Sequence, residues 1–392
     1  MIEFPAIQTR LNAEEEQAIL RVLREGKTWA AGPEGAAFEQ EFAQFIGSED
    51  AVALSNATAA LETAAILTGL GPGDEVIIPA HTFVSSAVPF ARTGATLKWA
   101  DIDPKTRLIS ADTIAPLISA RTRLLVIVHL YGLTADMDPI LELAKQHGLV
   151  VVEDCAQAPG ARYKGRRAGT LGDFGCFSFH SQKNITTLGE GGMLTVRDQE
   201  TGRNARRLRW MGNWPFEGER AAYWKPAMGN IVEPAAGVWP HNFCLAEVNC
   251  AVGRLLIKRL DSINASRRRQ AKRFHEALKA VPELVFQELP EGCEHVYHLM
   301  AARFDGGASN IQRDALIRLL FDKYEMKCIV QYWPLCRSEL FGKFGLGAAD
   351  VPETDRYFDN MISFPWWSEM GDELVDDLAG RVCAAMAELR KA

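Results

Sequence analysis

Three short segments place polar or charged side chains directly after apolar, strand-like runs of sequence. The first is Ser55 to Ala60, which connects such a run to a helix-like stretch. The first backbone N–H groups of a helix have no partner within the helix, and together with the helix dipole they favour a bound anion. Thr58 adds a hydroxyl group next to Ala57. An ordinary Ser/Asn helix cap is the competing interpretation, and the segment taken alone favours that cap.

The second segment, Asp154 to Gln157, follows the buried strand expected over residues 149–152. Ligands of open α/β sheets bind beyond the carboxyl ends of the strands, which is where Asp154 and Gln157 fall. A carboxylate at this place could cap the next helix, or it could form a salt bridge with a protonated ring nitrogen. The residues themselves leave both interpretations open.

The third segment contains Lys183, between the apolar run 174–179 and the glycine-rich turn 189–192. A lysine in a polar turn is usually only solvated. A lysine packed between two strands would instead have a lowered pKa, which a Schiff-base nucleophile needs.

Together these segments contain the parts of a pyridoxal phosphate site: an anion cradle, a carboxylate for a ring nitrogen and a sequestered lysine. Each part follows a different strand of one expected sheet. Phe83, at the end of another strand, could stack on the pyridine ring. The sequence therefore predicts pyridoxal 5'-phosphate as the cofactor.

Two further patterns do not support a binding site. Gly69–Gly73 is rich in glycine, but it follows a helix and precedes a strand, which is the reverse of a dinucleotide-binding turn. Glu294–His298 is one residue short of the HExxH zinc motif and leads into a strand, so a satisfied structural pair is the better interpretation. We therefore predict no metal site.

Apolar strands alternate with helical stretches through the first part of the chain. Asn12 and Glu15 form a capping-box pattern for a first helix that runs to Gly26. Such alternation is typical of a mostly parallel sheet with helices on both faces, a three-layer α/β fold. The expected strands are residues 51–54, 75–78, 97–100, 124–128, 149–152, 174–179 and 193–196, and the expected helices are 36–45, 57–70, 84–93 and 138–147.

Beyond the sheet, the pattern changes to a smaller α+β unit. It opens with a helical stretch over residues 244–281, interrupted near Asp261, and continues with strands 284–286, 298–304 and 327–331 and helices 311–324 and 372–389. Residues 211–241, rich in Trp, Pro and Gly, are interpreted as a long functional loop. The predicted domains are residues 1–245, with the N-terminal helices and the cofactor site, and residues 246–392, with the connecting helix.

The composition argues against several classes of protein. The 392 residues contain 43 Lys and Arg against 50 Asp and Glu, a formal charge of −7, which lacks the basic footprint of a nucleic-acid binder. No run approaches the roughly 20 apolar residues of a membrane span. Eight cysteines without a CxxC pair indicate reduced thiols, and the first residues show no signal-peptide pattern. We expect a cytoplasmic protein without nucleic-acid or membrane partners.

Several motifs together resemble the DegT/StrS family of sugar aminotransferases, within the fold-type I, aspartate aminotransferase-like pyridoxal phosphate enzymes. The resemblance covers nearly the whole chain and is strongest at Asp154–Gln157 and Phe177–Asn184. Trp29–Pro33, Val128–Asp138 and Gly189–Gly192 add to it. It implies a fold-type I large domain followed by a smaller C-terminal α+β domain.

The resemblance also implies a role for each candidate residue. Lys183 would hold the cofactor as a Schiff base and shuttle a proton between the cofactor and the substrate. Asp154 would pair with the pyridinium nitrogen, Gln157 would lie near the phenolic oxygen, and Phe83 would lie over the ring. The phosphate would be bound by Ala57, Thr58 and Ser178.

In this family an asparagine of the partner subunit also reaches the phosphate, from a segment that usually reads Asn-Tyr-Arg-Met-Ser-Glu. Here His241–Glu247 fills that place and nominates Asn242, with Cys244 and Leu245 where Arg and Met are usual. The resemblance therefore implies a homodimer with shared active sites. The alternative is that Asn242 caps the helix expected near Cys244, while the loop tryptophans pack on their own domain.

The expected activity is transfer of an amino group from glutamate or glutamine to a keto-sugar, nucleotide-linked by family default, or to a keto-cyclitol. Members with histidine in place of the lysine are sugar dehydratases, whereas Lys183 is present here. One alternative is a pyridoxal phosphate dehydratase or aromatising synthase acting on an aminated ring; another is a catalytically idle regulatory subunit. The family's His-Tyr-x-Pro-Leu-His pattern reads Gln331–Cys336 here, without either histidine, so the sequence does not identify the acceptor.

Overall fold

The computed structural model describes residues 1–214, 230–307 and 311–391. The part of the Trp- and Pro-rich segment that covers residues 215–229 therefore lies outside the described residues. Within them, no helix is both long enough and apolar enough to cross a membrane.

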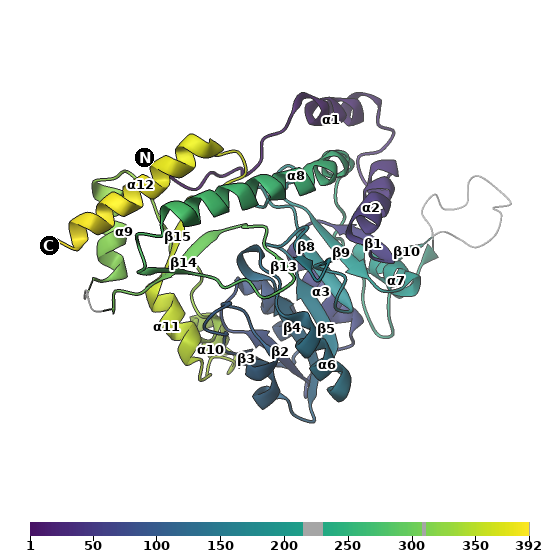
Figure 1. Ribbon diagram of the computed structural model, residues 1–392. Coiled ribbons are helices and arrows are strands. Elements are labelled where there is room, and N and C mark those ends of the chain that lie inside the picture. Colours follow the sequence, from purple (N-terminus) through teal and green to yellow (C-terminus); the bar gives the residue numbers. More distant parts are fainter. Residues whose placement is uncertain (215–229, 308–310, 392) are drawn as a thin grey trace.

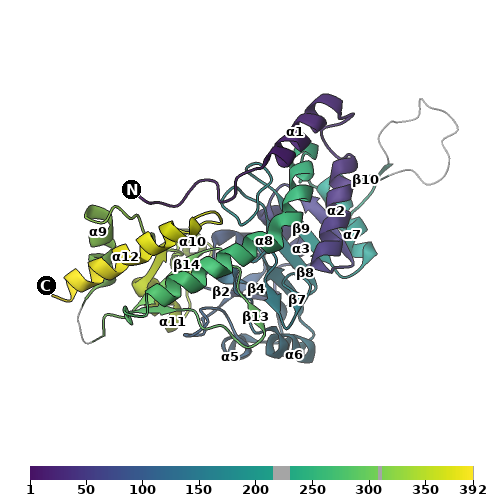
Figure 2. The ribbon, with the colours of Figure 1, turned by 45° about the horizontal axis from the view of Figure 1, so that its top comes forward.

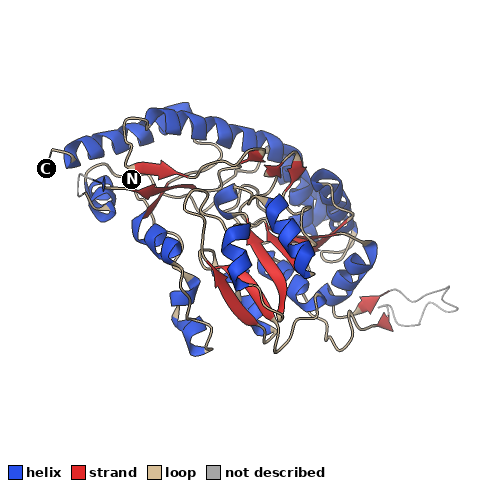
Figure 3. Cartoon of the chain, turned by 60° about the horizontal axis from the view of Figure 1, so that its bottom comes forward, coloured by secondary structure: helices blue, strands red, loops and turns tan. Residues whose placement is uncertain are grey.

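A seven-stranded sheet forms the centre of the larger unit (Figures 1 and 3). The strand order is β1-β9-β8-β5-β4-β2-β3, and β9 runs antiparallel to both of its neighbours while the remaining pairs are parallel. This topology confirms the expected α/β fold with a mostly parallel sheet. The strands are β1 (Asp50–Leu54), β2 (Glu75–Pro79), β3 (Thr96–Ala100), β4 (Thr122–Val128), β5 (Val150–Asp154), β8 (Phe174–Ser178) and β9 (Gly192–Val196).

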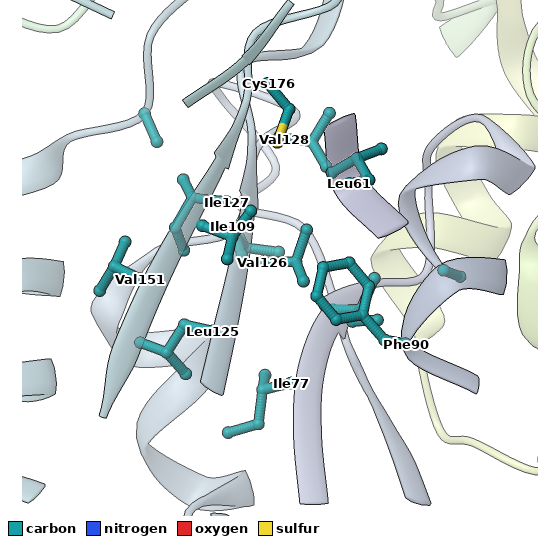
Figure 4. Packing of buried hydrophobic residues seen from close by; sticks show 14 of the residues in the cluster. Leu61, Ile77, Phe90, Ile109, Leu125, Val126, Ile127, Val128, Val151 and Cys176 are labelled. Atoms are coloured by element: carbon teal, nitrogen blue, oxygen red, sulfur yellow. The ribbon is translucent and has the colours of Figure 1, made fainter. Parts of the chain in front are cut away.

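On the β1 side of this sheet the two faces are buried in different hydrophobic clusters, because side chains alternate along a strand, whereas the buried apolar side chains of β2 and β4 belong to one cluster on both faces. Along β1, Val52 and Leu54 belong to one cluster, whereas Ala51 and Ala53 belong to the other. The first cluster includes side chains of the helix α3 (Ala57–Leu67). Figure 4 shows two members of this cluster, Leu61 of α3 and Phe90, among the side chains of the strands. The second cluster is covered by α2 (Pro33–Ile46) and by the first half of α8 (Glu247–Ala277). The result is the three-layer arrangement expected from the sequence.

Further helices around the sheet include the expected ones and two that the sequence analysis did not assign, over residues 111–114 and 199–209. The first helix, α1 (Ala13–Glu25), has the complete capping box, with the Asn12 side chain accepting from the Glu15 N–H and the Glu15 carboxylate accepting in return. The stretch expected over 84–93 is a short 3₁₀ turn, Val84–Ser86, followed by the five-residue helix Val88–Arg92. The remaining helices of this unit are α4 (Val88–Arg92), α5 (Ala111–Ile114), α6 (Met137–His147) and α7 (Gln199–Arg209), and the short strands are β6 (Arg162–Tyr163), β7 (Arg166–Arg167), β10 (Asn213–Trp214) and β11 (Asn230–Ile231).

The smaller unit contains a three-stranded antiparallel sheet in the order β12-β14-β15. Its hydrophobic cluster joins the second half of α8 to α12 (Gly371–Leu389), which lies along α8 in Figures 1 and 2. The other elements are β12 (Leu284–Phe286), β13 (Cys293–Glu294), β14 (Met300–Phe304), α9 (Arg313–Asp322), α10 (Glu339–Lys343), α11 (Pro352–Asn360) and β15 (Met361–Phe364).

Two predictions about this smaller unit are wrong. The helix α8 continues through Asp261 without a break, because Asp261 is exposed while Leu260 and Ile263 on either side are buried. Residues 327–331 form no strand; only Ile329 pairs with the sheet, through one bridge to Ser363 of β15. The strand β15 is the segment that completes the sheet, and the sequence analysis did not assign it.

The N-terminal segment belongs to both units. The Ile2 N–H donates to the Glu325 carbonyl, and the Ile2 carbonyl accepts from the Lys327 N–H at 2.8 Å, so the chain begins against the smaller unit. Farther along, the Gln8 N–H donates to the Ser181 carbonyl at 3.1 Å. The first residues thus run from the smaller unit to the turn that carries Lys183. The change from one cluster to the other lies within α8, which supports α8 as the connecting helix. We propose a division at residues 245 and 246, with α8 counted as part of the smaller unit.

Candidate active site

A pocket of about 360 Å³ opens at the carboxyl ends of the parallel strands, between the large sheet and the smaller unit. Seven of the eight candidate residues line it, and they come from the ends of different strands, as expected. These residues are Ala57, Thr58, Phe83, Asp154, Gln157, Ser178 and Lys183. The eighth candidate, Asn242, does not line the pocket of its own chain.

The start of α3 provides the anion cradle. The Asn56 side chain accepts from the Ala59 N–H at 2.8 Å, which leaves the N–H groups of Ala57 and Thr58 without a partner inside the helix. The local backbone is crowded, because a Cβ atom on Gly192 would lie 2.4 Å from the Asn56 carbonyl carbon and oxygen. Glycine at the start of β9 therefore lets this strand approach the helix N-terminus closely. The structure shows the Asn56 cap, and the cap leaves the first N–H groups of the helix open to an anion, so the anion-binding prediction remains compatible with it.

Asp154, at the end of β5, has a fixed carboxylate. Its Oδ2 accepts from the Ser86 hydroxyl at 2.7 Å, and its Oδ1 accepts from the Ala156 N–H at 3.0 Å. The Ser86 hydroxyl also lies 2.9 Å from that of Thr82. Asp154 caps no helix, because β5 is followed by turns and then by β6. The carboxylate is only 5% exposed, so an opposite charge placed in the pocket would interact with it strongly.

The side-chain amide of Gln157 hydrogen-bonds to both Tyr131 and Tyr332. Its Oε1 accepts from the Tyr131 N–H at 2.7 Å, which requires Nε2 to be the atom that donates to the Tyr332 hydroxyl at 2.9 Å. Tyr131 has a φ of 62°, a left-handed conformation that turns its N–H toward this amide. Phe83 contacts the Tyr332 ring edge-on at 5.9 Å between centroids and is 51% exposed. Its exposed part borders the pocket, where a planar ring could stack on it.

Lys183 lies in a turn after β8, where its N–H donates to the His180 carbonyl at 2.8 Å. Burial lowers the pKa of the Lys183 amine, while the nearby carboxylates of Asp154 and Glu190 act in the opposite direction. A lowered pKa increases the fraction of free amine, the form that attacks a carbonyl carbon. This environment fits the nucleophile interpretation of Lys183 better than that of a solvated turn lysine.

The sequence analysis missed several residues of the pocket. Ser86 gives no local signal, because its role depends on a contact 68 residues away along the chain. Phe4 and Pro5 reach the pocket from the N-terminus, and Tyr332 reaches it from the smaller unit. Of the Glu294–His298 pattern, His298 also lines the pocket, whereas Glu294 and His295 do not.

One group of side chains within the described residues has the composition of a metal site: His129, Glu153 and Cys155. Its carboxylate is already saturated, because Glu153 Oε1 accepts from two backbone N–H groups at 2.7 and 2.6 Å and Oε2 accepts from another at 2.9 Å. His129 Nε2 lies 2.8 Å from Oε2, and His129 Nδ1 accepts from the Ala135 N–H. This cluster therefore shapes the turns behind Asp154 and is satisfied without an ion.

Asn242 lies in an exposed segment beside the anion cradle. The Ser55 N–H donates to the neighbouring Phe243 carbonyl at 2.8 Å, and Asn242 pairs with Trp210 through an isolated bridge. The interpretation of Asn242 as a helix cap is wrong, because Ala246 occupies the cap position of α8. Its side chain is therefore available to something outside its own pocket.

These residues fit pyridoxal 5'-phosphate by the chemistry of the groups that line the pocket. Free helix N–H groups with the hydroxyls of Thr58 and Ser178 suit a phosphate, and the buried carboxylate of Asp154 suits a protonated ring nitrogen. The Lys183 amine shares the same pocket and suits an aldehyde carbon.

Comparison with known proteins agrees with this geometry. The spore coat polysaccharide biosynthesis protein SpsC of Bacillus subtilis is 35% identical over 94% of this chain and 93% of its own length. GDP-perosamine synthase of Caulobacter vibrioides is 36% identical over 81% of this chain and 82% of its own. Both similarities extend through the large and the small unit.

Solved structures show the same fold over the whole chain. An aminotransferase from Psychrobacter cryohalolentis superposes with a TM-score of 0.89 at 29% identity, covering 98% of this chain and 99% of its own. The PLP-form of a putative sugar aminotransferase from Streptococcus pneumoniae superposes with a TM-score of 0.86 at 26% identity, covering 99% of both chains. Residues 9–384 match the family described as the DegT/DnrJ/EryC1/StrS aminotransferase family. The chain is therefore a pyridoxal phosphate-dependent aminotransferase and belongs to the DegT/DnrJ/EryC1/StrS family.

Proposed function

We propose that this enzyme moves an amino group from glutamate or glutamine to the carbonyl carbon of a nucleotide-linked keto-sugar, with a keto-cyclitol as the second acceptor class. The observation that carries the proposal is the single pocket shared by the anion cradle of α3, the Asp154 carboxylate and the Lys183 amine. The similarity to GDP-perosamine synthase supports the nucleotide-linked acceptor.

Each residue of the pocket has a separate task in this proposal. When bound, the cofactor supplies an aldehyde that takes up the amino group and a ring that accepts electrons. The N–H groups of Ala57 and Thr58 and the Ser178 hydroxyl hold its phosphate. Asp154, oriented by Ser86, keeps a proton on the ring nitrogen.

Lys183 acts as the base and acid of the reaction. Its amine, once free, takes a proton from one carbon and returns it to the other, for which a pKa near the working pH is the most effective. Gln157 is held by Tyr131 and Tyr332, and because its NH₂ group has two N–H donors, the second N–H can donate to the phenolic oxygen while the first stays on Tyr332.

We also propose a homodimer in which the partner subunit's Asn242 completes the phosphate site. Three observations support this proposal. Asn242 is exposed, it does not line the pocket of its own chain, and four large apolar side chains within residues 210–239 are exposed as well. These are Trp210, whose backbone pairs with Asn242, and Met211, Ile231 and Trp239, with Trp239 87% exposed. Exposed apolar side chains in one region usually mark an interface. The composition of the chain is consistent with the cytoplasm as its location.

The spectrum of the purified enzyme tests the activity. Adding glutamate or glutamine should convert the yellow form of the enzyme to its amine form, and a keto-sugar nucleotide should restore the yellow colour. A dehydratase or aromatising synthase would release an altered ring without net amino transfer, and an idle subunit would show no conversion. A stable yellow spectrum with both donors and a panel of nucleotide-linked and cyclitol ketones would contradict the proposal.

A further inference from the structure

The backbone of His298 is fixed by a buried arginine. Arg267 of α8 donates from Nε to the Tyr297 carbonyl and from Nη2 to the His298 carbonyl, both at 2.9 Å. Arg267 is fully buried, has no carboxylate partner among the described residues, and has its pKa lowered to about 9 by that burial. Burying a cation without a carboxylate partner costs free energy, and the loss of any hydrogen bond to the guanidinium group would add to that cost. The two contacts from Arg267 therefore hold the backbone at Tyr297 and His298 in one position.

The imidazole ring of His298 is oriented by a chain of two amides. Its Nδ1 lies 3.1 Å from Asn184 Oδ1, while Asn184 Nδ2 lies 3.2 Å from the Val296 carbonyl and 3.1 Å from Asn264 Oδ1. Asn264 Nδ2 in turn lies 2.9 Å from the Pro159 carbonyl. Backbone carbonyls can only accept, so the two contacts to them fix which end of each amide is the NH₂ group. Asn184 Oδ1 must therefore accept, and the proton of the His298 ring must be on Nδ1.

A neutral imidazole with its proton on Nδ1 carries an open lone pair on Nε2. Burial, followed by the charges of Lys183 and Arg267 and by His295, holds the pKa of His298 well below its usual range. Within residues 1–214, 230–307 and 311–391, the structure gives Nε2 no hydrogen-bond partner, and His298 lines the pocket that contains Lys183. The unpartnered Nε2 thus belongs to a ring that borders the pocket, where a donor can reach it.

We propose that His298 is a positioning residue for Lys183, with Nε2 accepting a hydrogen bond from the lysine amine whenever that amine is free. The proposal rests on the assignment of Lys183 as the reacting amine. An acceptor at this place keeps the amine in the pocket between the two proton transfers and favours its protonated form. The fixed tautomer matters, because a ring with its proton on Nε2 would repel the ammonium group instead.

The tautomer can be tested directly in the full-length, cofactor-free protein. With ¹⁵N-labelled histidine, the resonances of His298 can be assigned among the eight histidines by their loss in His298→Asn. We expect a neutral ring with a protonated Nδ1 and an unprotonated Nε2 from about pH 6 to pH 8. A proton on Nε2, or an imidazolium over this range, would overturn the proposal.

Two substitutions of His298 distinguish the role of Nδ1 from that of Nε2. In His298→Asn, the amide NH₂ can still donate to Asn184, but the acceptor at the Nε2 position is lost. In His298→Gln, the longer amide returns an acceptor to that position. The quantity to measure is the pKa of Lys183 in cofactor-free protein, from the pH dependence of reductive trapping with free pyridoxal.

We expect His298→Asn to lower the pKa of Lys183 by about one unit, a tenfold loss in proton affinity, because a hydrogen bond to the charged amine is removed. His298→Gln should recover part of this loss. His295→Asn is the matched control, since His295 is buried nearby but does not line the pocket, and it should leave the Lys183 pKa unchanged. The same Lys183 pKa in His298→Asn and the parent would overturn the role. Neither measurement depends on amino transfer, so this proposal and the proposed function can fail separately.

Discussion

At the scale of single residues, Lys183 and Asp154 divide the chemistry between an amine of lowered pKa and a carboxylate with a fixed orientation. Replacing Lys183 by Ala should reduce turnover by roughly 10⁴-fold or more, because both amine exchange and proton transfer need this group. The fold should persist, since within the described residues no hydrogen bond of the Lys183 amine connects elements of the fold. Steady-state rates and circular dichroism of the purified variant test both parts, and substantial activity would remove Lys183 from its role.

Asp154→Asn should separate chemistry from binding. The amide can still accept from Ser86, so the variant should keep much of its cofactor affinity, but a neutral amide holds a ring proton far less well than a carboxylate does. We expect kcat to fall by a factor that is at least about ten times larger than the factor by which the cofactor Kd rises. A factor of ten corresponds to a change of one pKa unit in the ring nitrogen. Cofactor titration and single-turnover kinetics measure the two quantities. Equal losses in both would show that Asp154 only helps to bind the cofactor.

At the scale of elements, the close approach of β9 to the start of α3 depends on a residue without a side chain. Gly192→Ala would place a Cβ atom 2.4 Å from the Asn56 backbone and 2.8 Å from the Ala57 nitrogen. The helix N-terminus must then shift, which should weaken cofactor binding and cost roughly 1–3 kcal/mol of stability.

Gly71→Ala provides the matched control, because its Cβ atom would meet nothing within 4 Å. Denaturant unfolding and cofactor titration of both variants, side by side with the parent, are the measurements. Parent-like cofactor affinity in Gly192→Ala would mean that the cradle does not depend on this approach.

The elements also show why part of the structure could be predicted from the sequence. Local signals, such as the capping box at Asn12 and the short apolar run of β1, decide local conformation, and those elements formed as expected. The break expected at Asp261 did not occur, because the burial of Leu260 and Ile263 outweighs one exposed polar residue. The strand β15 was missed because its pairing partner, β14, lies far away in the sequence.

In the pocket, too, residues with a local sequence signal could be predicted, whereas residues placed by long-range contacts could not. Motifs at strand ends nominated Asp154, Gln157 and Lys183, since the rule for parallel sheets places such residues at one edge. Ser86 and His298 enter through contacts that join distant segments, and neither has a neighbouring residue that reveals its role. Long-range contacts of this kind become visible only once the units are packed together.

At the scale of the whole molecule, buried histidines should make the fold sensitive to acid. Burial lowers the pKa of His81 to about 3 and that of His275 to about 4 from an ordinary value of 6.5. Below about pH 6.5 these histidines therefore bind protons in the unfolded chain but not in the folded chain. The free energy of unfolding consequently falls as the pH drops from 6.5 toward 3. For His81 alone the loss approaches roughly 4 kcal/mol.

Denaturant unfolding between about pH 7 and pH 4.5 tests this prediction, within the window set by these pKa values. His81→Gln should be less stable than the parent at neutral pH but should lose less stability on acidification. An unchanged slope of stability against pH in the variant would show that His81 is not the responsible group.

The proposed dimer predicts that two variants with defects in different residues restore activity to each other in mixed dimers. Lys183→Ala chains carry an intact Asn242, and Asn242→Ala chains carry an intact Lys183, so one site of a mixed dimer would have both. Mixing the two inactive or weakened variants under exchange conditions should therefore restore part of the activity, up to roughly half of the parent rate per mixed dimer. Full activity of a monomer in sedimentation experiments would rule out shared sites.

The path of the N-terminal segment has a consequence for synthesis on the ribosome. Ile2 bonds to residues 325 and 327, and the pocket takes Phe4 from one end of the chain and Tyr332 from near the other. The large sheet, whose last strand ends at Val196, can begin to fold while translation continues, since domains generally fold as units from the N-terminus. Residues 2–8 must nevertheless wait until residues 325–332 have left the exit tunnel before they reach their final place. A nascent chain therefore forms its large sheet before its pocket is complete.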